Sequence, residues 1–226
     1  MGPSQGQGVP APYNDDGKAW DLKVIQTKVP SNTSFNSVLD GWGTGPLEAV
    51  VLAGSPIGGD KKTVAASTLV DVTRDVTEDG QLNLTVPLSD AYDYTLFSAY
   101  LIHSHWQAQD SPLLMEGPQT APESWVQNGS WAVDHFSARG AQLATKFWEE
   151  HMLNDGVLEL VQEVGNYAWE DSVEIRQNYR WTEGFLQRFE NEHRYDLKRF
   201  LPVIFGFKTD QWDEGERYTM DYRSTV

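Results

Sequence analysis

Cysteine is absent from the 226 residues, and basic residues are scarce. Without cysteine the chain can have no disulfide framework, no thiolate metal site and no cysteine nucleophile. Its 17 Lys and Arg stand against 33 Asp and Glu, which gives a net charge of −16. Nucleic acids and anionic membrane surfaces both select proteins with a surplus of Lys and Arg. We therefore expect neither nucleic acid nor a membrane as a partner.

Several common functional motifs are also missing. No apolar run approaches the roughly 20 residues of a membrane span, and residues 1–6 lack the apolar core of a signal peptide. Ser-His-Asp hydrolase chemistry is not supported, because no Gly-x-Ser-x-Gly elbow stands between a strand pattern and a helix pattern. The glycine-rich run at residues 41–46 lacks the Lys-Ser/Thr pair of a phosphate-binding loop. Its glycines around Trp42 fit either close backbone packing or a loop that stacks on a sugar.

The first half of the chain is dominated by strand patterns. Alternating or continuous apolar residues, separated by Gly and Asp turns, predict strands at 20–29, 47–55, 63–73, 82–88 and 91–104. Short strands joined in this way are typical of a small antiparallel β unit. We expect such a unit over residues 47–105.

The second half changes to helical patterns after an irregular connection at 106–130. Helices are predicted at 138–153, 157–164 and 182–194, with a short buried strand at 166–171. The last twenty residues are polar and show no core pattern. The order helix, helix, strand, helix suits part of an α/β barrel, in which acids at the carboxyl end of a strand face the active site.

We therefore predict an α/β fold, a partial (β/α) TIM-type barrel with an inserted antiparallel β unit. Three segments follow from the patterns: a partial barrel segment, the inserted β unit, and a helix-strand-helix barrel segment that carries the candidate catalytic acid. Their expected ranges are residues 1–46, 47–105 and 106–226.

Residues 165–175, GNYAWEDSVEI, combine acids with large aromatics. Sugar-cleaving sites need both, because carboxyl groups transfer protons and aromatic faces stack on the pyranose ring. From composition alone, a strand that runs into a charged turn explains the stretch better. Glu170 and Glu174 could form a local pair, or one of them could be a lone general acid whose partner lies elsewhere.

His103, Ser104 and His105 place two imidazoles at the spacing of metal ligands. Nothing nearby in the sequence supplies an obvious third ligand, apart from Asp110 or the distant pair Asp134 and His135. The more typical role of such residues is to lie at the polar end of a strand. We assign no metal site.

From Asp171 onward the sequence resembles a known family. The core Asp171-Ser172-Val173-Glu174, the following Trp181-Thr182 and the closing YDLKRFLP at 195–202 look like a block of the glycoside hydrolase family 106 α-L-rhamnosidases. Upstream, residues 76–100 resemble the β segment inserted in that family, and residues 132–152 resemble the helix that returns the chain to the barrel. The opening GPSQGQGVPAP is similar to a loop of secreted fungal relatives.

This resemblance implies an extracellular, inverting enzyme that releases terminal L-rhamnose from glycans and often binds calcium. It assigns Glu174 as the general acid. Tyr167 and Trp169 would then lower the local polarity and raise the pKa of that acid, as proton donation near neutral pH requires. The substrate-binding candidates are Tyr167, Trp169, Glu170, Asp171 and Trp42.

The resemblance also leaves parts of the family pattern unmatched. The second catalytic glutamate is expected downstream of Val226, and the first barrel strands are expected upstream of Met1, so the chain resembles an interior fragment. Two other functions stay open. One is a carbohydrate-binding protein without catalysis, and the other is an inactive truncated remnant.

Overall fold

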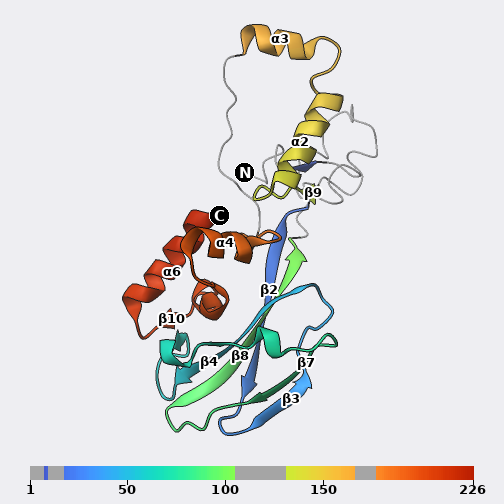
Figure 1. The fold of residues 1–226 in the computed structure, drawn as a ribbon. Coiled ribbons are helices and arrows are strands. Elements are labelled where there is room, and N and C mark those ends of the chain that lie inside the picture. Colours follow the sequence, from blue (N-terminus) through green and yellow to red (C-terminus); the bar gives the residue numbers. More distant parts are fainter. Residues whose placement is uncertain (1–7, 10–17, 105–130, 166–176) are drawn as a thin grey trace, which may run out of the picture. The chain divides into compact units, whose positions relative to one another are not determined.

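A computed structural model describes residues 8–9, 18–104, 131–165 and 177–226. The chain divides into two compact units. The first unit comprises residues 1–21 and 103–182, and the second comprises residues 22–102 and 183–226. Figure 1 shows the helices and strands of both units. The division into three segments stays a prediction.

The second unit is built on a four-stranded sheet with the strand order β2–β8–β4–β6. Strand β4 runs antiparallel to both of its neighbours, β8 and β6. Strands β2 and β8 occur where the sequence predicts them, because each has a long alternating or apolar pattern. The strands are β2 (Trp20–Val29), β4 (Leu47–Pro56), β6 (Val70–Asp71) and β8 (Tyr92–His103).

Strand β4 is buried along most of its length, from residue 49 to residue 55. Because successive side chains of a strand point to opposite faces, β4 contributes to two separate cores. Val50 and Leu52 belong to one apolar cluster, with side chains of β2, β7 and β8. Val51 and Ala53 belong to another, which includes Phe97 and is packed against aromatic side chains from the C-terminal region.

A two-stranded antiparallel sheet covers the first of these cores. It pairs β3 (Ser34–Val38) with β7 (Gln81–Thr85). Leu82 of β7 is buried in the cluster, and Phe35 and Leu84 pack against it. Strands β2 and β3 precede residue 47, so the antiparallel β structure also uses residues from the segment expected to belong to the barrel.

C-terminal helices pack against the other face (Figure 1). They are α4 (Phe185–His193), the 3₁₀ turn η5 (Lys198–Phe200), α5 (Leu201–Ile204) and α6 (Trp212–Thr225). The last twenty residues contribute to the core, although their sequence shows no core pattern. Tyr218 of α6 is buried and stacks on Phe200 with 3.7 Å between ring centroids, and Thr225 is fully buried.

The single strand predicted at 63–73 is also wrong. This segment forms β5 (Thr63–Val64), η1 (Ala66–Thr68), β6 and η2 (Thr73–Asp75). The hydroxyl of Thr68 donates to the carbonyl of Ala65 at 2.7 Å, and the amide of Thr73 donates to Asp71 at 2.9 Å. Such local hydrogen bonds compete with a continuous strand ladder. β5 pairs in parallel with β10 (Lys208–Thr209).

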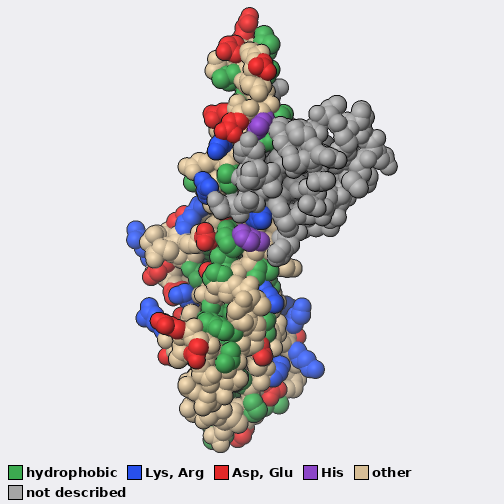
Figure 2. Space-filling view, turned by 90° about the vertical axis from the view of Figure 1, so that its right-hand side faces the viewer, with side chains coloured by type: hydrophobic (Ala, Val, Ile, Leu, Met, Phe, Trp, Pro, Cys, Tyr) green, Lys and Arg blue, Asp and Glu red, His purple; other side chains and the backbone are tan. Residues whose placement is uncertain are grey.

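In the first unit, β1 (Gly8–Val9) pairs with β9 (Trp131–Ala132), and two helices follow. Helix α2 (Ala138–His151) begins at the predicted residue and is capped by Ser137, whose side chain accepts a hydrogen bond from the amide of Gly140. Helix α3 (Val157–Val164) has no buried residue. Helix α3 is labelled at the top of Figure 1, and the top of the space-filling view in Figure 2 shows apolar side chains beside acidic ones.

The predicted mixture of helices and strands, including antiparallel sheets, is confirmed. A TIM-type barrel is not confirmed, because the strands in the described ranges form no closed barrel. Among those same residues, no helix has the length and apolar character needed to cross a bilayer.

Trp42 lies in the turn after β3, and a glycine outside the run at residues 41–46 allows its ring to pack closely. A Cβ atom added to Gly80 would lie 2.2 Å from the indole ring of Trp42, and Gly80 has a φ of +81°. Gly43 has a nearly identical φ of +83°, with no atom within 4 Å of the added Cβ. Gly80 therefore provides the surface on which the Trp42 ring packs.

We expect Gly80→Ala to reduce the free energy of unfolding much more than Gly43→Ala. Alanine at a positive φ costs about 1 kcal/mol in both variants. The collision with Trp42 adds about 2 kcal/mol at position 80 alone. Urea unfolding followed by circular dichroism measures both values, and equal losses would contradict the close packing of Trp42 on Gly80.

Candidate functional site

Most of the sequence-predicted site lies outside the described residues. This holds for Glu174, the candidate acid, and for Tyr167, Trp169, Glu170 and Asp171. Trp42 is described, and its side chain is 37% exposed in the second unit. That these residues lie together in one site therefore stays a prediction. The structure does describe the chain that follows Glu174, from Gln177 onward.

That following chain is held by a buried carboxylate, Asp21, whose side chain is only 3% exposed. The backbone amide and side-chain amide of Asn178 donate to Oδ2 of Asp21 at 2.8 and 2.9 Å. The backbone amide of Tyr179 donates to Oδ1 at 2.9 Å. Hydrogen bonds to an ionised carboxylate are stronger than neutral ones, so Asp21 fixes the backbone of two consecutive residues.

A second buried carboxylate, Asp134, holds the chain a few residues further on. The hydroxyl of Thr182 donates to Oδ2 of Asp134 at 2.6 Å, and the amide of Phe136 donates to Oδ1 at 3.0 Å. Asp134 is 2% exposed and Thr182 is 5% exposed. Residues 178–182 are therefore attached to two carboxylates from distant parts of the sequence.

Aromatic rings lie beside this anchored chain. Trp181 is fully buried, and its backbone forms an isolated antiparallel bridge with Trp20. The indole of Trp20 stacks on the imidazole of His103, with 4.0 Å between ring centroids. Burial, followed by the charge of Asp21, raises the pKa of the Tyr179 hydroxyl above its usual value. Tyr179 is therefore protonated at neutral pH and cannot serve as a base there.

The described residues do not fit a metal ion. Within the described ranges, no group of three or more His, Cys, Asp or Glu side chains is placed to hold one. His103 stacks on Trp20, His135 donates from Nδ1 to the carbonyl of Val133 at 2.7 Å, and His105 lies outside the described residues. No reaction step is therefore assigned to calcium.

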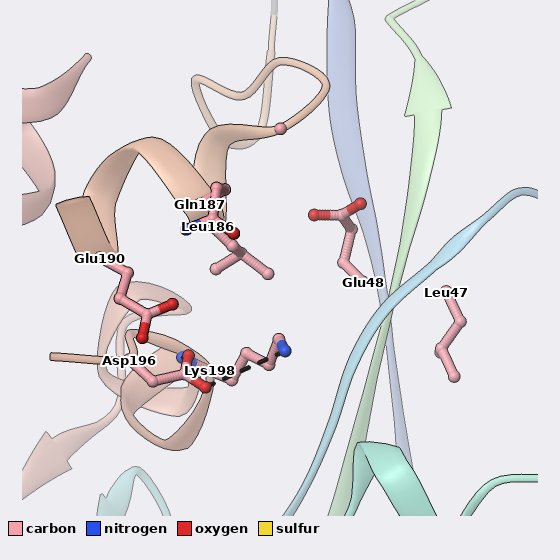
Figure 3. A pocket seen from close by; sticks show the side chains of 8 residues that line it. Leu47, Glu48, Leu186, Gln187, Glu190, Asp196 and Lys198 are labelled. Atoms are coloured by element: carbon pink, nitrogen blue, oxygen red, sulfur yellow. Dashed lines mark hydrogen bonds and ion pairs between the residues drawn. The ribbon is translucent and has the colours of Figure 1, made fainter.

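A polar pocket of about 280 Å³ lies in the second unit between β4 and α4. In Figure 3 the carboxylate of Glu48 points from β4 toward α4, and the ammonium group of Lys198 points toward β4. Lys198 forms an ion pair with Asp196 at 4.0 Å, and its side chain is 26% exposed. The other lining residues are Leu47, Gly184, Leu186, Gln187 and Glu190.

The pocket offers hydrogen-bond acceptors, donors and apolar surface together. Glu48, Glu190 and Asp196 accept hydrogen bonds, whereas Lys198 and Gln187 can donate them. Three carboxylates against one ammonium group favour a neutral or cationic ligand over an anion. The volume lies just below the range of about 300–1,000 Å³ that is usual for ligand pockets, so it suits a small polar molecule such as one sugar ring.

Comparison with known families decides the assignment. The profile of a glycoside hydrolase family, Glyco_hydro_106, described as alpha-L-rhamnosidase, matches residues 45–226, which is most of the chain. The chain belongs to this family. A search of curated proteins found no match.

Membership in glycoside hydrolase family 106 confirms the resemblance seen in the sequence. At the family level, the chain is a rhamnosidase-like glycoside hydrolase whose substrate class is carbohydrate. The matched range includes Glu174, the anchored residues 178–182 and the pocket between β4 and α4. A fungal branch and fragment status stay predictions.

Sequence reasoning missed both anchoring carboxylates. In β2, Asp21 and Lys23 are polar residues two positions apart, on the same face of the strand. This alternating pattern predicts that the side chain of Asp21 is exposed. Its partner Asn178 is 157 positions away. No local signal in the sequence joins the two residues. For Asp134 the sequence suggests only the role of a distant metal ligand.

We expect Thr182→Val to reduce the free energy of unfolding by about 2 kcal/mol, because it removes a hydrogen bond from a buried carboxylate. Thr27 provides a matched control, since its hydroxyl donates to Asp40 at the same 2.6 Å in an exposed position. Thr27→Val should cost less than about 0.5 kcal/mol. Thermal and urea unfolding measure both variants, and equal costs would refute the role assigned to burial.

Proposed function

We propose that this chain carries the general acid of an inverting α-L-rhamnosidase, and that Glu174 is that acid. The single observation that carries the proposal is the family match over residues 45–226, which includes Glu174. We further propose terminal L-rhamnose on a glycan as the substrate and an extracellular location for the enzyme. The neighbouring Tyr167, Trp169, Glu170 and Asp171, together with Trp42, are the proposed sugar-binding residues.

The proposed chemistry is hydrolysis of a glycosidic bond. The protonated carboxyl group of Glu174 donates its proton to the glycosidic oxygen as the bond from the anomeric carbon to that oxygen breaks. A water molecule adds to the opposite face of the sugar and gives its proton to a second carboxylate, which inverts the configuration. An inverting enzyme holds the two carboxyl groups about 6.5–9.5 Å apart, which leaves room for this water.

The sequence around Glu174 and the structure just after it support a proton donor in this region. Tyr167 and Trp169 are large apolar neighbours in sequence, and apolar surroundings raise the pKa of a carboxyl group. Residues 178–182 are attached to Asp21 and Asp134. A rigid attachment suits catalysis, because a catalytic group must be held close to its productive geometry.

We expect Glu174→Gln in the complete enzyme to lower kcat/KM about 10²–10⁴-fold on a rhamnoside with an alkyl or sugar leaving group. The loss should be much smaller on 4-nitrophenyl α-L-rhamnoside, because nitrophenolate leaves without a proton. Glu183→Gln is the control, since Glu183 is an exposed carboxylate nearby in sequence. Unchanged turnover of the alkyl rhamnoside in Glu174→Gln would overturn the assignment.

A second candidate function is glycan binding without catalysis, and the pocket between β4 and α4 favours it. It combines acceptors, donors and apolar side chains in a volume suited to a small polar ligand. This function does not depend on Glu174, because every lining residue lies in the second unit.

We expect Lys198→Ala to weaken L-rhamnose binding at this pocket about tenfold, because it removes a partly buried charged donor. Calorimetric titration of L-rhamnose into Glu174→Gln protein measures this affinity with turnover suppressed. Lys61→Ala is the control, since Lys61 is exposed and does not line the pocket. Equal affinities in the two lysine variants would exclude the pocket as a sugar-binding site.

A further inference from the structure

A further pocket in the second unit differs in character from the pocket between β4 and α4. It has a volume of about 600 Å³, and its lining residues come from α5, β10, α6 and the turn after α5 (Figure 1). All of these residues belong to the second unit. The volume is within the range of about 300–1,000 Å³ that is usual for ligand pockets, so the pocket can accommodate a small organic molecule.

Part of the lining is apolar and is supported by the core. The apolar members are Val203 and Ile204 of α5, Phe207, and Met220 of α6. Val203 is buried, and the ring of Phe207 packs edge-on against the buried Phe97 with 4.9 Å between ring centroids. Met220 is 67% exposed, and its flexible side chain can adapt to the shape of an apolar ligand. The pocket therefore offers apolar surface that is already in place.

Cationic side chains outnumber the acid in the lining. Lys208 of β10 and Arg223 in the last turn of α6 stand against one carboxylate, Glu216. Within the described residues, the structure shows no ion pair for either cation. This local surplus of positive charge occurs in a chain whose net charge is −16. Because a cleft lined mainly by one sign of charge attracts the opposite sign, the pocket favours an anionic ligand.

The hydroxyl groups of the lining are already used within the chain. The hydroxyl of Thr209 donates to the carbonyl of Gln211 at 2.7 Å and accepts from the amide of the same residue at 2.9 Å. The hydroxyl of Thr219 donates to the carbonyl of Gly215 at 3.1 Å. Each hydroxyl has a single proton to donate, so the side chains that can donate to a ligand are the two cations. This set suits one anionic group better than the several hydroxyls of a sugar ring.

We propose that this pocket binds a small organic carboxylate with an apolar body, either aromatic or aliphatic. The apolar body packs on Val203, Phe207 and Met220, and the carboxylate lies at Lys208 and Arg223. An Arg guanidinium can donate two parallel hydrogen bonds to a carboxylate. The proposal stands on residues of the C-terminal region alone, so it goes beyond glycoside hydrolysis and does not depend on it.

The first test uses the unmodified chain and two ligands of the same shape. 2-Naphthoate carries a carboxylate, whereas 2-naphthamide carries a neutral amide in its place. Calorimetric titration should give a dissociation constant at least about tenfold lower for the naphthoate. Octanoate, titrated in the same way, distinguishes an aliphatic body from an aromatic one. Binding of neither carboxylate, or equal affinities for naphthoate and naphthamide, would overturn the proposal.

Two double variants test the role of the charges. Lys208→Ala combined with Arg223→Ala should weaken naphthoate binding about tenfold and leave naphthamide binding unchanged. Lys61→Ala combined with Arg74→Ala is the matched control. It removes the same charge from exposed positions of the second unit that do not line the pocket. Equal naphthoate affinities in the two double variants would overturn the assignment of the carboxylate to this pocket.

Thr219→Phe tests the location, because a phenyl ring introduced from α6 would occupy the pocket. We expect it to weaken the binding of naphthoate and naphthamide alike, by at least about tenfold. Unchanged affinity for naphthoate would place its binding elsewhere and overturn the proposal. If circular dichroism shows that Thr219→Phe does not fold, the two double variants decide the location, since their substitutions lie at exposed positions.

Discussion

The burial of β4 on both faces is the constraint on which the second unit depends. A strand covered on both sides is expected to be mostly apolar. Residues 49–54 are all apolar, and the buried Ser55 that follows is polar but uncharged. One face of β4 packs under β3 and β7, and the other packs against aromatic side chains of the C-terminal region. The N-terminal strands and the C-terminal helices therefore fold onto the same short apolar run, although they lie far apart in the sequence.

Elements with a strong local pattern could be predicted from the sequence, whereas elements defined by distant partners could not. Strands β2 and β8 and helices α2, α3 and α4 have periodic apolar residues or a clear cap, and they occur close to where the sequence places them. Helix α6 has few apolar residues, and its burial depends on Tyr218, which packs on Phe200 and Tyr195. No pattern within the last twenty residues reveals those contacts.

At the candidate site, too, interactions between residues distant in the sequence could not be predicted. Its proposed chemistry rests on the acids and aromatics that are adjacent in the sequence near Glu174, within the range of the family match, and it stays a prediction. The two buried carboxylates that hold residues 178–182 could not be predicted from the sequence. Asp21 and Asp134 are isolated acids, and an isolated acid in a strand pattern most often faces water. Their burial depends on amides and a hydroxyl that only the folded chain brings near.

Helix α3 has a consequence for how the protein behaves in solution. It has eight residues, none of them buried, and isolated helices of fewer than about 12 residues are marginal in water. Its amide hydrogens should therefore exchange with solvent long before those of β4, whose exchange requires the second unit to open. A protease added at low concentration should cut within residues 157–164 while the sheet stays intact. Limited digestion thus offers a simple way to separate the polypeptide on either side of α3 before any global unfolding.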